Sequence, residues 1–215
     1  MSLLNRSTWW KALPLFLWLP TLLGGCAGPM LPHAQEDKTH SYLLEWDAAL
    51  GGNRLRSDGP SLLVSAMRSA PGFESAEMAY VRSTHQLEYF AWHRWVDAPA
   101  HMLDPMLLQA AAGAGLFKSV SEVGSGTQAQ LRLDSRLLHL RQVYTSEPAE
   151  LQLAVRLALV DVPSARQVGS QVVSVDEPLQ ASTPAAGVAA ANRAVARLLT
   201  QVEGFLAEHA GRYRQ

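Results

Sequence analysis

The chain has 215 residues, of which 48% are hydrophobic and 17% are charged, and its 18 basic residues nearly balance its 19 acidic ones. No basic face or polybasic stripe stands out, which argues against nucleic acid or an electrostatically bound lipid surface as the partner. Cys26 is the single cysteine, so no disulfide framework within the chain is expected.

Residues 1–25 have the pattern of a secretory signal peptide. Arg6 and Lys11 form a basic stretch without acidic residues, and residues 12–23 form an almost purely apolar run. Pro14 and Pro20 interrupt this run, which is also shorter than the about 20 apolar residues that a membrane-spanning helix needs. We therefore predict export of the chain rather than a permanent transmembrane helix.

The segment Leu23-Gly24-Gly25-Cys26 resembles the lipobox of bacterial lipoprotein precursors. The small glycines let an extended chain enter a signal peptidase, and the thiol is the group that can be S-acylated. The resemblance implies cleavage between Gly25 and Cys26, diacylglycerol on the sulfur and a fatty acid such as palmitate on the new amino group. Several acyl chains give stable anchoring. In bacterial lipoproteins, aspartate directly after the acylated cysteine is the usual signal for retention at the inner membrane. Ala27 occupies that position here, which favours the periplasmic face of the outer membrane. The alternative is a stray or buried cysteine behind an ordinary signal peptide.

Cleavage would remove Arg6 and Lys11 and leave a mature chain with a small net negative charge of about −3. Residues 26–40 are polar and contain Pro29 and Pro32, which predicts an acylated cysteine followed by a flexible tether. Residues 41–212 are enough for one domain with a sizeable core.

The first half of this domain reads as short strands and one helix. Strands are predicted over 41–46 and 61–68, separated by a turn-rich loop over 51–60, and the second strand is broken at 70–73. Residues 77–82 and 86–92 predict a hairpin. Asp97-Ala98-Pro99 predicts a helix start, and Pro105 must either kink that helix or restart it after Asp104.

The second half predicts long strands and a closing helix. Residues 130–144 change the parity of their leucines near Ser135, which indicates a β-bulge. Residues 151–159 alternate without a break and predict a strand with one buried face, paired with residues 166–175. Thr183 is the expected cap of the last helix, with Pro184 at its first position and Gly211 after its end. The expected class is α+β: a single domain with a mixed or mostly antiparallel sheet and two main helices on one face.

Residue patterns that would indicate chemistry are scarce. The seven histidines form no His-x-x-x-His or Glu-x-x-His pair, so no metal site and no cofactor are predicted. Residues 124–127 resemble a fragment of a nucleotide-binding loop but lack its lysine, and we read them as a tight turn. No serine lies in a G-x-S-x-G motif. We expect no enzyme and name no catalytic residue.

An aromatic cluster is the best candidate for a contact site. Tyr89, Phe90, Trp92 and Trp95 follow one another closely, and such residues can line a protein interface or a hydrophobic ligand groove. Tyr89, Trp92 and Trp95 are therefore the candidate partner or ligand contacts. The alternative is that these rings pack beneath the helix that begins near Pro99.

The domain also resembles a known family through several short motifs in a fixed order. They are Tyr42-Leu43-Leu44, Pro71-Gly72-Phe73, Met78-x-Tyr80, Leu87-x-Tyr89, Trp95-x-Asp97-x-Pro99, Gly115-Leu116-Phe117-x-x-Val120 and Asn192-x-Ala194. In this order the motifs resemble those of the ABC-type transport auxiliary lipoproteins, which include PqiC/YmbA-like lipoproteins associated with MCE-type lipid transport systems. The chain departs from the pattern at His40-Ser41 and in loop 51–60, which leaves the partner surface less defined than the fold.

The resemblance implies a non-catalytic component in the periplasm that helps an ABC or MCE assembly move phospholipid or another hydrophobic solute across the envelope. MCE-domain protein and ABC transporter subunits would be its partners, contacted through an exposed sheet edge or through residues 89–95, and a homo-oligomer fits such an assembly. The alternative is a periplasmic lipid-binding carrier, which would need a sizeable apolar pocket beside Trp92 or Trp95. A periplasmic hydrolase is the third hypothesis, and no candidate residues support it.

Overall fold

The computed structural model describes residues 38–46 and 54–211. The predictions for the signal peptide, Cys26 and most of the tether lie outside the described residues. A long antiparallel meander forms the centre of the fold, from β7 (Leu131–Val143) through β8 (Glu150–Asp161) to β9 (Arg166–Pro178). The alternation predicted for residues 151–159 is confirmed, since all five odd-numbered side chains are buried.

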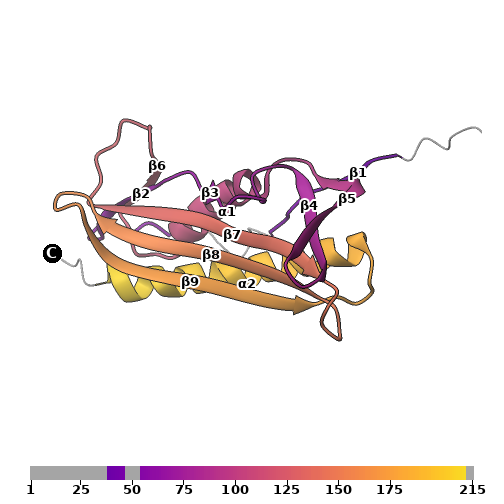
Figure 1. Cartoon of the computed structure of the whole chain (residues 1–215). Helices are drawn as coiled ribbons and strands as arrows, with labels where there is room; N and C mark the ends of the chain where they lie inside the picture. Colours follow the sequence, from indigo (N-terminus) through magenta and orange to yellow (C-terminus); the bar gives the residue numbers. More distant parts are fainter. Residues whose placement is uncertain (1–37, 47–53, 212–215) are drawn as a thin grey trace, which may run out of the picture. The chain divides into compact units, whose positions relative to one another are not determined.

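Short strands pair with the other side of β7, one after another along its length. They are β2 (Ser61–Val64), β3 (Arg68–Ser69) and β4 (Glu77–Ser83), and all three run parallel to β7. β6 (Ser119–Glu122) extends the sheet beyond β2, while β5 (Gln86–Trp95) and then β1 (His40–Tyr42) extend it beyond β4. The sheet is therefore mixed, and β1 is one of its edges (Figure 1).

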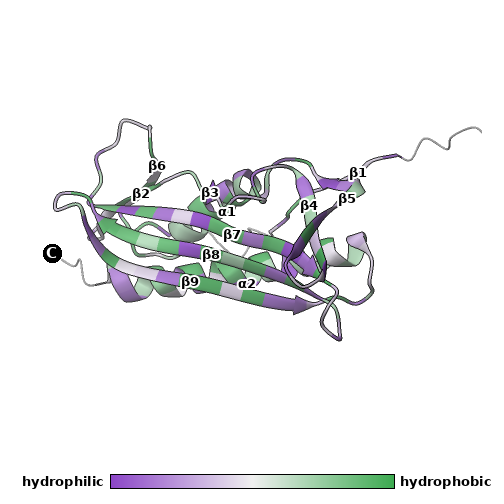
Figure 2. Ribbon diagram, in the orientation of Figure 1, coloured by the Kyte–Doolittle hydropathy of each residue, from purple (hydrophilic) through white to green (hydrophobic). Residues whose placement is uncertain are grey.

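Two helices complete the domain. α1 (Pro99–Gly113) packs against α2, β6 and β7, and α2 (Pro184–Ala210) packs along β7, β8 and β9. The predicted cap is confirmed, because the Ala186 amide donates to Thr183 Oγ1 at 3.2 Å, and Gly211 follows the last turn. Figure 2 shows hydrophobic and hydrophilic residues alternating along β7 to β9, as expected for strands whose two faces differ. The α+β class is confirmed.

Three local predictions change in the structure. The strand expected over 61–68 is split into β2 and β3, because the Met67 amide donates to Asp104 Oδ1 at 2.7 Å instead of to a neighbouring strand. The bulge in β7 lies between Leu137 and His139 rather than near Ser135. Of the adjacent Leu137 and Leu138, Leu137 is the one that is buried in the core. β6 is a further strand, in a segment for which no strand was predicted.

Pro105 neither breaks nor restarts the helix. It lies inside a continuous α1, between Leu103 and Leu107, which are both buried in the core. Proline in a helix interior removes one backbone hydrogen bond. Burial of the leucines on either side offsets that loss and keeps α1 in one piece.

Candidate functional site

The aromatic segment belongs to β5, which lies between β4 and the edge strand β1. Near its start β5 pairs with β4, through Tyr89 opposite Ala79, but at its end the register has shifted so that Arg94 lies opposite Glu77. Irregularities of this kind bend a strand and redirect its side chains. The same end of β5 pairs in parallel with β1, which places Tyr42 beside Trp95.

The two faces of the β1–β5 pair differ sharply. His93 and Trp95 share one face with His40 and Tyr42, and Trp95 is only 2% exposed within the core. Trp92 and Arg94 point to the opposite face because successive side chains of a strand alternate. The two tryptophans of the predicted contact site are thus separated by the sheet.

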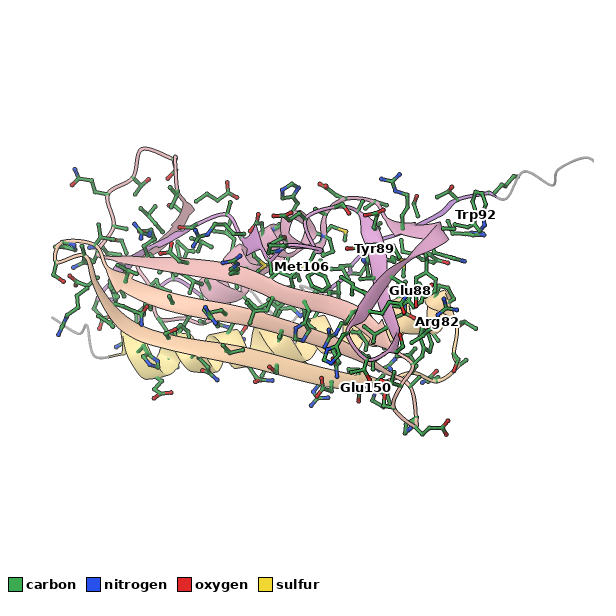
Figure 3. The ribbon with its side chains drawn as sticks, in the orientation of Figure 1. Arg82, Glu88, Tyr89, Trp92, Met106 and Glu150 are labelled. Atoms are coloured by element: carbon green, nitrogen blue, oxygen red, sulfur yellow. The ribbon has the colours of Figure 1, made fainter. Side chains whose placement is uncertain are left out.

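Three exposed apolar side chains lie along that outer face, with Arg94 between Trp92 and Val96. Leu43, Trp92 and Val96 are 52%, 50% and 48% exposed, respectively, and we call them the apolar strip. The Val96 amide donates to the Tyr42 carbonyl at 2.9 Å, so the strip continues across the ends of both strands. Figure 3 shows Trp92 beside β1, away from the long meander.

A cluster of rings supports the strip from the other face. His93 stacks between His40 and Tyr42, with ring centroids 5.1 and 5.8 Å away, and its Nδ1 lies 3.0 Å from the Tyr42 hydroxyl. Phe90 meets His93 edge-on. Burial, and then the nearby His40, lower the pKa of His93 from its ordinary value, which favours the neutral form of the His93 imidazole. The Glu45 amide donates to Asn192 Oδ1 at 3.1 Å, which ties the chain just after β1 to α2.

Tyr89 lies apart from the apolar strip. It is 36% exposed, and its hydroxyl donates to the Gly72 carbonyl at 3.0 Å, which fixes the ring against the loop between β3 and β4. Of the three contact residues predicted from the sequence, Trp92 alone belongs to the strip. Leu43 was missed, because the pairing of β1 with β5 that brings it next to Val96 joins segments about 50 residues apart. Val96 directly follows the aromatic segment and was not singled out.

The core beside Trp95 is filled. The gap lined by Met78, Trp95, Leu140 and Leu151, among others, leaves no room for a water molecule. Among the described residues, no group of three or more histidine, cysteine, aspartate or glutamate side chains could hold a metal ion. No helix of the described part of the chain is long and apolar enough to cross a membrane.

Comparisons with solved structures agree on the fold. A Xanthomonas campestris protein of the family DUF330 superposes with a TM-score of 0.64 at 17% identity, covering 75% of this chain and 91% of its own. A second, uncharacterized protein gives 0.62 at 11% identity, covering 78% and 97%. The PelC dodecamer of Paraburkholderia phytofirmans gives 0.42 at 13% identity, covering 77% and 93%, which is too weak a similarity to bear on assembly of this chain.

Sequence comparison identifies the family. No curated protein matches the chain. The profile described as "ABC-type transport auxiliary lipoprotein component" matches residues 42–203, which span the domain from β1 to the last turns of α2. The motifs that suggested this resemblance lie in the same range. The chain therefore belongs to the family of ABC-type transport auxiliary lipoprotein components.

Proposed function

We propose that this lipoprotein is anchored in the outer membrane through Cys26 and docks, through the apolar strip, onto a periplasmic MCE-type transport assembly. In this role it is a non-catalytic component of a system that moves phospholipid or another hydrophobic solute across the envelope. Family membership supports a role beside an ABC transport system. We propose the MCE partner, the transported solute and the outer membrane in addition to that family role.

The exposed apolar strip is the observation that most directly supports docking. Trp92 is half exposed and shares its face with two exposed aliphatic side chains. Apolar surface in contact with water is unfavourable, and its burial against a partner is favourable. Tryptophan is also among the residues that most often dominate binding energy at interfaces. The strip adjoins the edge strand β1, whose outer backbone groups are open to pairing with a partner strand.

The position of β1 in the chain fits an anchored adaptor. His40, at the start of β1, is the fourteenth residue after Cys26. Even a fully extended chain of that length spans at most about 50 Å. The start of β1 therefore stays within about 50 Å of the proposed anchor at Cys26.

The carrier alternative is less well supported. Pockets that hold small molecules usually enclose about 300–1,000 Å³. Two hollows lined by described residues measure about 130 and 120 Å³, and neither borders Trp92 or Trp95. A domain that hands on an acyl chain needs more apolar space than these hollows offer.

Photo-crosslinking in cells tests the docking role. The photo-reactive residue p-benzoylphenylalanine replaces Trp92 in the full chain, and the matched control replaces Val172, which is 46% exposed on β9. Mass spectrometry should identify an MCE-domain protein or an ABC transporter subunit from position 92 and not from position 172. Equal capture from both positions, or no transport protein from either, contradicts docking through the strip. Stoichiometric lipid without a protein partner would favour the carrier.

A further inference from the structure

Three arginines form a row across neighbouring strands. Arg68 of β3 lies in register with Arg136 of β7, and Arg136 lies in register with Arg156 of β8. The neighbours of Arg156 along β8, Val155 and Leu157, are buried in the core, so the arginine row projects from the face that α2 does not cover. Like charges placed directly opposite each other destabilise a sheet.

The arginine row has none of the partners that other arginines of the domain have. Arg141 donates to Gln152, and Arg193 and Arg197 donate to Glu177. Within the described part of the chain, Arg68, Arg136 and Arg156 form no hydrogen bond or ion pair, and the Nε of Arg136 is buried without an acceptor. A buried guanidinium N–H without an acceptor costs free energy that a bound anion would recover.

The row borders a hollow of about 120 Å³. Its lining consists of Arg68, Asp134, Ser135, Arg136, Arg156 and Ala158. The volume is several times the about 10–15 Å³ that a single water requires. The small side chain of Ala158, which is in register with Asp134, leaves space next to the guanidinium groups.

Asp134 is the acidic residue of the hollow, and its carboxylate is already engaged. Arg132 donates to both of its oxygens at 2.9 Å, and the Ser65 hydroxyl donates to Oδ1 at 2.7 Å. Arg132 therefore balances most of the charge of Asp134, with a smaller electrostatic contribution from Arg68. The three arginines of the row keep a local excess of positive charge around the hollow.

We propose that this hollow binds a phosphate-type oxyanion, supplied either as inorganic phosphate or as the phosphodiester of a lipid headgroup. Guanidinium groups match phosphate oxygens with paired, charge-assisted hydrogen bonds. Arginines from three adjacent strands can contact several oxygens of one tetrahedral group, and a strand scaffold holds them in place without ligand. The site is independent of the apolar strip and of the docking proposal.

Binding to the full, acylated chain in a neutral maltoside detergent tests the site. Isothermal titration uses inorganic phosphate, dihexanoylphosphatidylglycerol as a soluble phosphodiester, and dihexanoylglycerol, which lacks phosphate. The double variant Arg68→Gln/Arg156→Gln changes two exposed members of the row and should fold. Its charge-matched control is Arg54→Gln/Arg166→Gln, since both of these arginines are exposed elsewhere on the domain.

At least one phosphate-containing probe should bind, and the row variant should weaken it by about tenfold or more, because each lost charge-assisted hydrogen bond is worth that much or more. The control variant should bind as the natural chain does. Binding of inorganic phosphate alone assigns the site to the free ion, and binding of the phospholipid alone assigns it to a headgroup. The proposal is overturned if neither probe binds, if the row variant binds unchanged, or if dihexanoylglycerol binds as well as the phospholipid.

Discussion

Trp92 and Trp95 show how much three positions along one strand can change the role of a residue. Trp95 is 2% exposed and packs with Met78 and Leu140, whereas Trp92 is 50% exposed. The two side chains lie on opposite faces of the β1–β5 pair, because the residues from Trp92 to Trp95 alternate between the faces. One ring therefore stabilises the core, and the other remains available to a partner.

Alanine substitution should separate these two roles. Trp95→Ala should lower the free energy of unfolding by about 3–5 kcal/mol, because it leaves a cavity in a filled core. Trp92→Ala should change it by less than about 0.5 kcal/mol, because the ring is half in solvent. Urea denaturation followed by circular dichroism measures both. Similar losses from the two variants would show that Trp92 is a structural residue.

Glu177 is a buried charge that joins the sheet to α2. Its side chain is 9% exposed, and it accepts hydrogen bonds from Arg197 at 2.6 Å and from Arg193 at 3.3 Å. Burial by itself would raise the pKa of Glu177. The hydrogen bonds and charges of Arg197 and Arg193 outweigh that effect, so the pKa lies below its ordinary value of 4.5.

Glu177→Gln should destabilise the domain in a pH-dependent way. A carboxylate whose pKa is lowered by folding contributes stability above its unfolded pKa and loses it as the pH falls through the folded pKa. At pH 7 the free energy of unfolding of the variant should be about 1–2 kcal/mol lower than that of the natural chain. The loss is no larger because the two arginines are partly exposed to solvent. That difference should shrink as the pH falls below 4.5.

Urea unfolding at pH 7 and at pH 3 measures the difference. Glu208→Gln, at an exposed position of α2, serves as the control and should show little change at either pH. A Glu177→Gln effect of the same size at both values of pH would mean that the charge of Glu177 contributes nothing.

At the scale of the element, α2 contains two glycines in opposite environments. Gly187 lies against the sheet, where an added Cβ would meet the buried Gln142 side chain at 2.0 Å from its Cδ. Gly204 is exposed, and an added Cβ there would meet nothing within 4 Å. Close packing of α2 on the sheet requires glycine at position 187, whereas position 204 has no such requirement.

Alanine at these two positions should therefore shift stability in opposite directions. Gly204→Ala should raise the free energy of unfolding by about 0.5–1 kcal/mol, the usual advantage of alanine in a helix interior. Gly187→Ala should lower it by about 1–3 kcal/mol, because Gln142 has to move from its packed position. Thermal denaturation of both variants makes the comparison. Stabilisation by Gly187→Ala would show that α2 can move away from the sheet at little cost.

At the scale of the whole molecule, the lipid anchor proposed at Cys26 would decide where the domain is located. We expect the mature chain to begin at Cys26 and to have diacylglycerol on its sulfur and a fatty acid on its amine. Intact-mass spectrometry of the detergent-extracted protein tests this, and Cys26→Ser should lose the acyl mass. An unmodified thiol at Cys26 would contradict lipid anchoring.

Membrane fractionation tests the choice of membrane. The natural chain should sediment with the outer membrane, and Ala27→Asp should shift it to the inner-membrane fraction if the bacterial sorting pattern applies. Identical distribution of the two chains would show that residue 27 does not direct sorting here.

The sequence by itself determined the family and most of the secondary structure. Period-two alternation in residues 151–159 and the Thr183, Pro184 and Gly211 signals are local patterns, and the chain follows them because each is set by neighbouring residues. The mixed sheet with helices on one face also followed from the order of these elements.

Only the tertiary structure decided which exposed groups lie together. The pairing of β1 with β5 brings Leu43 onto the same face as Trp92, and the pairing of β3, β7 and β8 aligns three arginines from distant segments. It also decided that Trp95 is buried. The register shift between β5 and β4 determines which side chains of β5 meet the core. Such contacts depend on register between segments far apart in the chain, and local periodicity contains no information about that register.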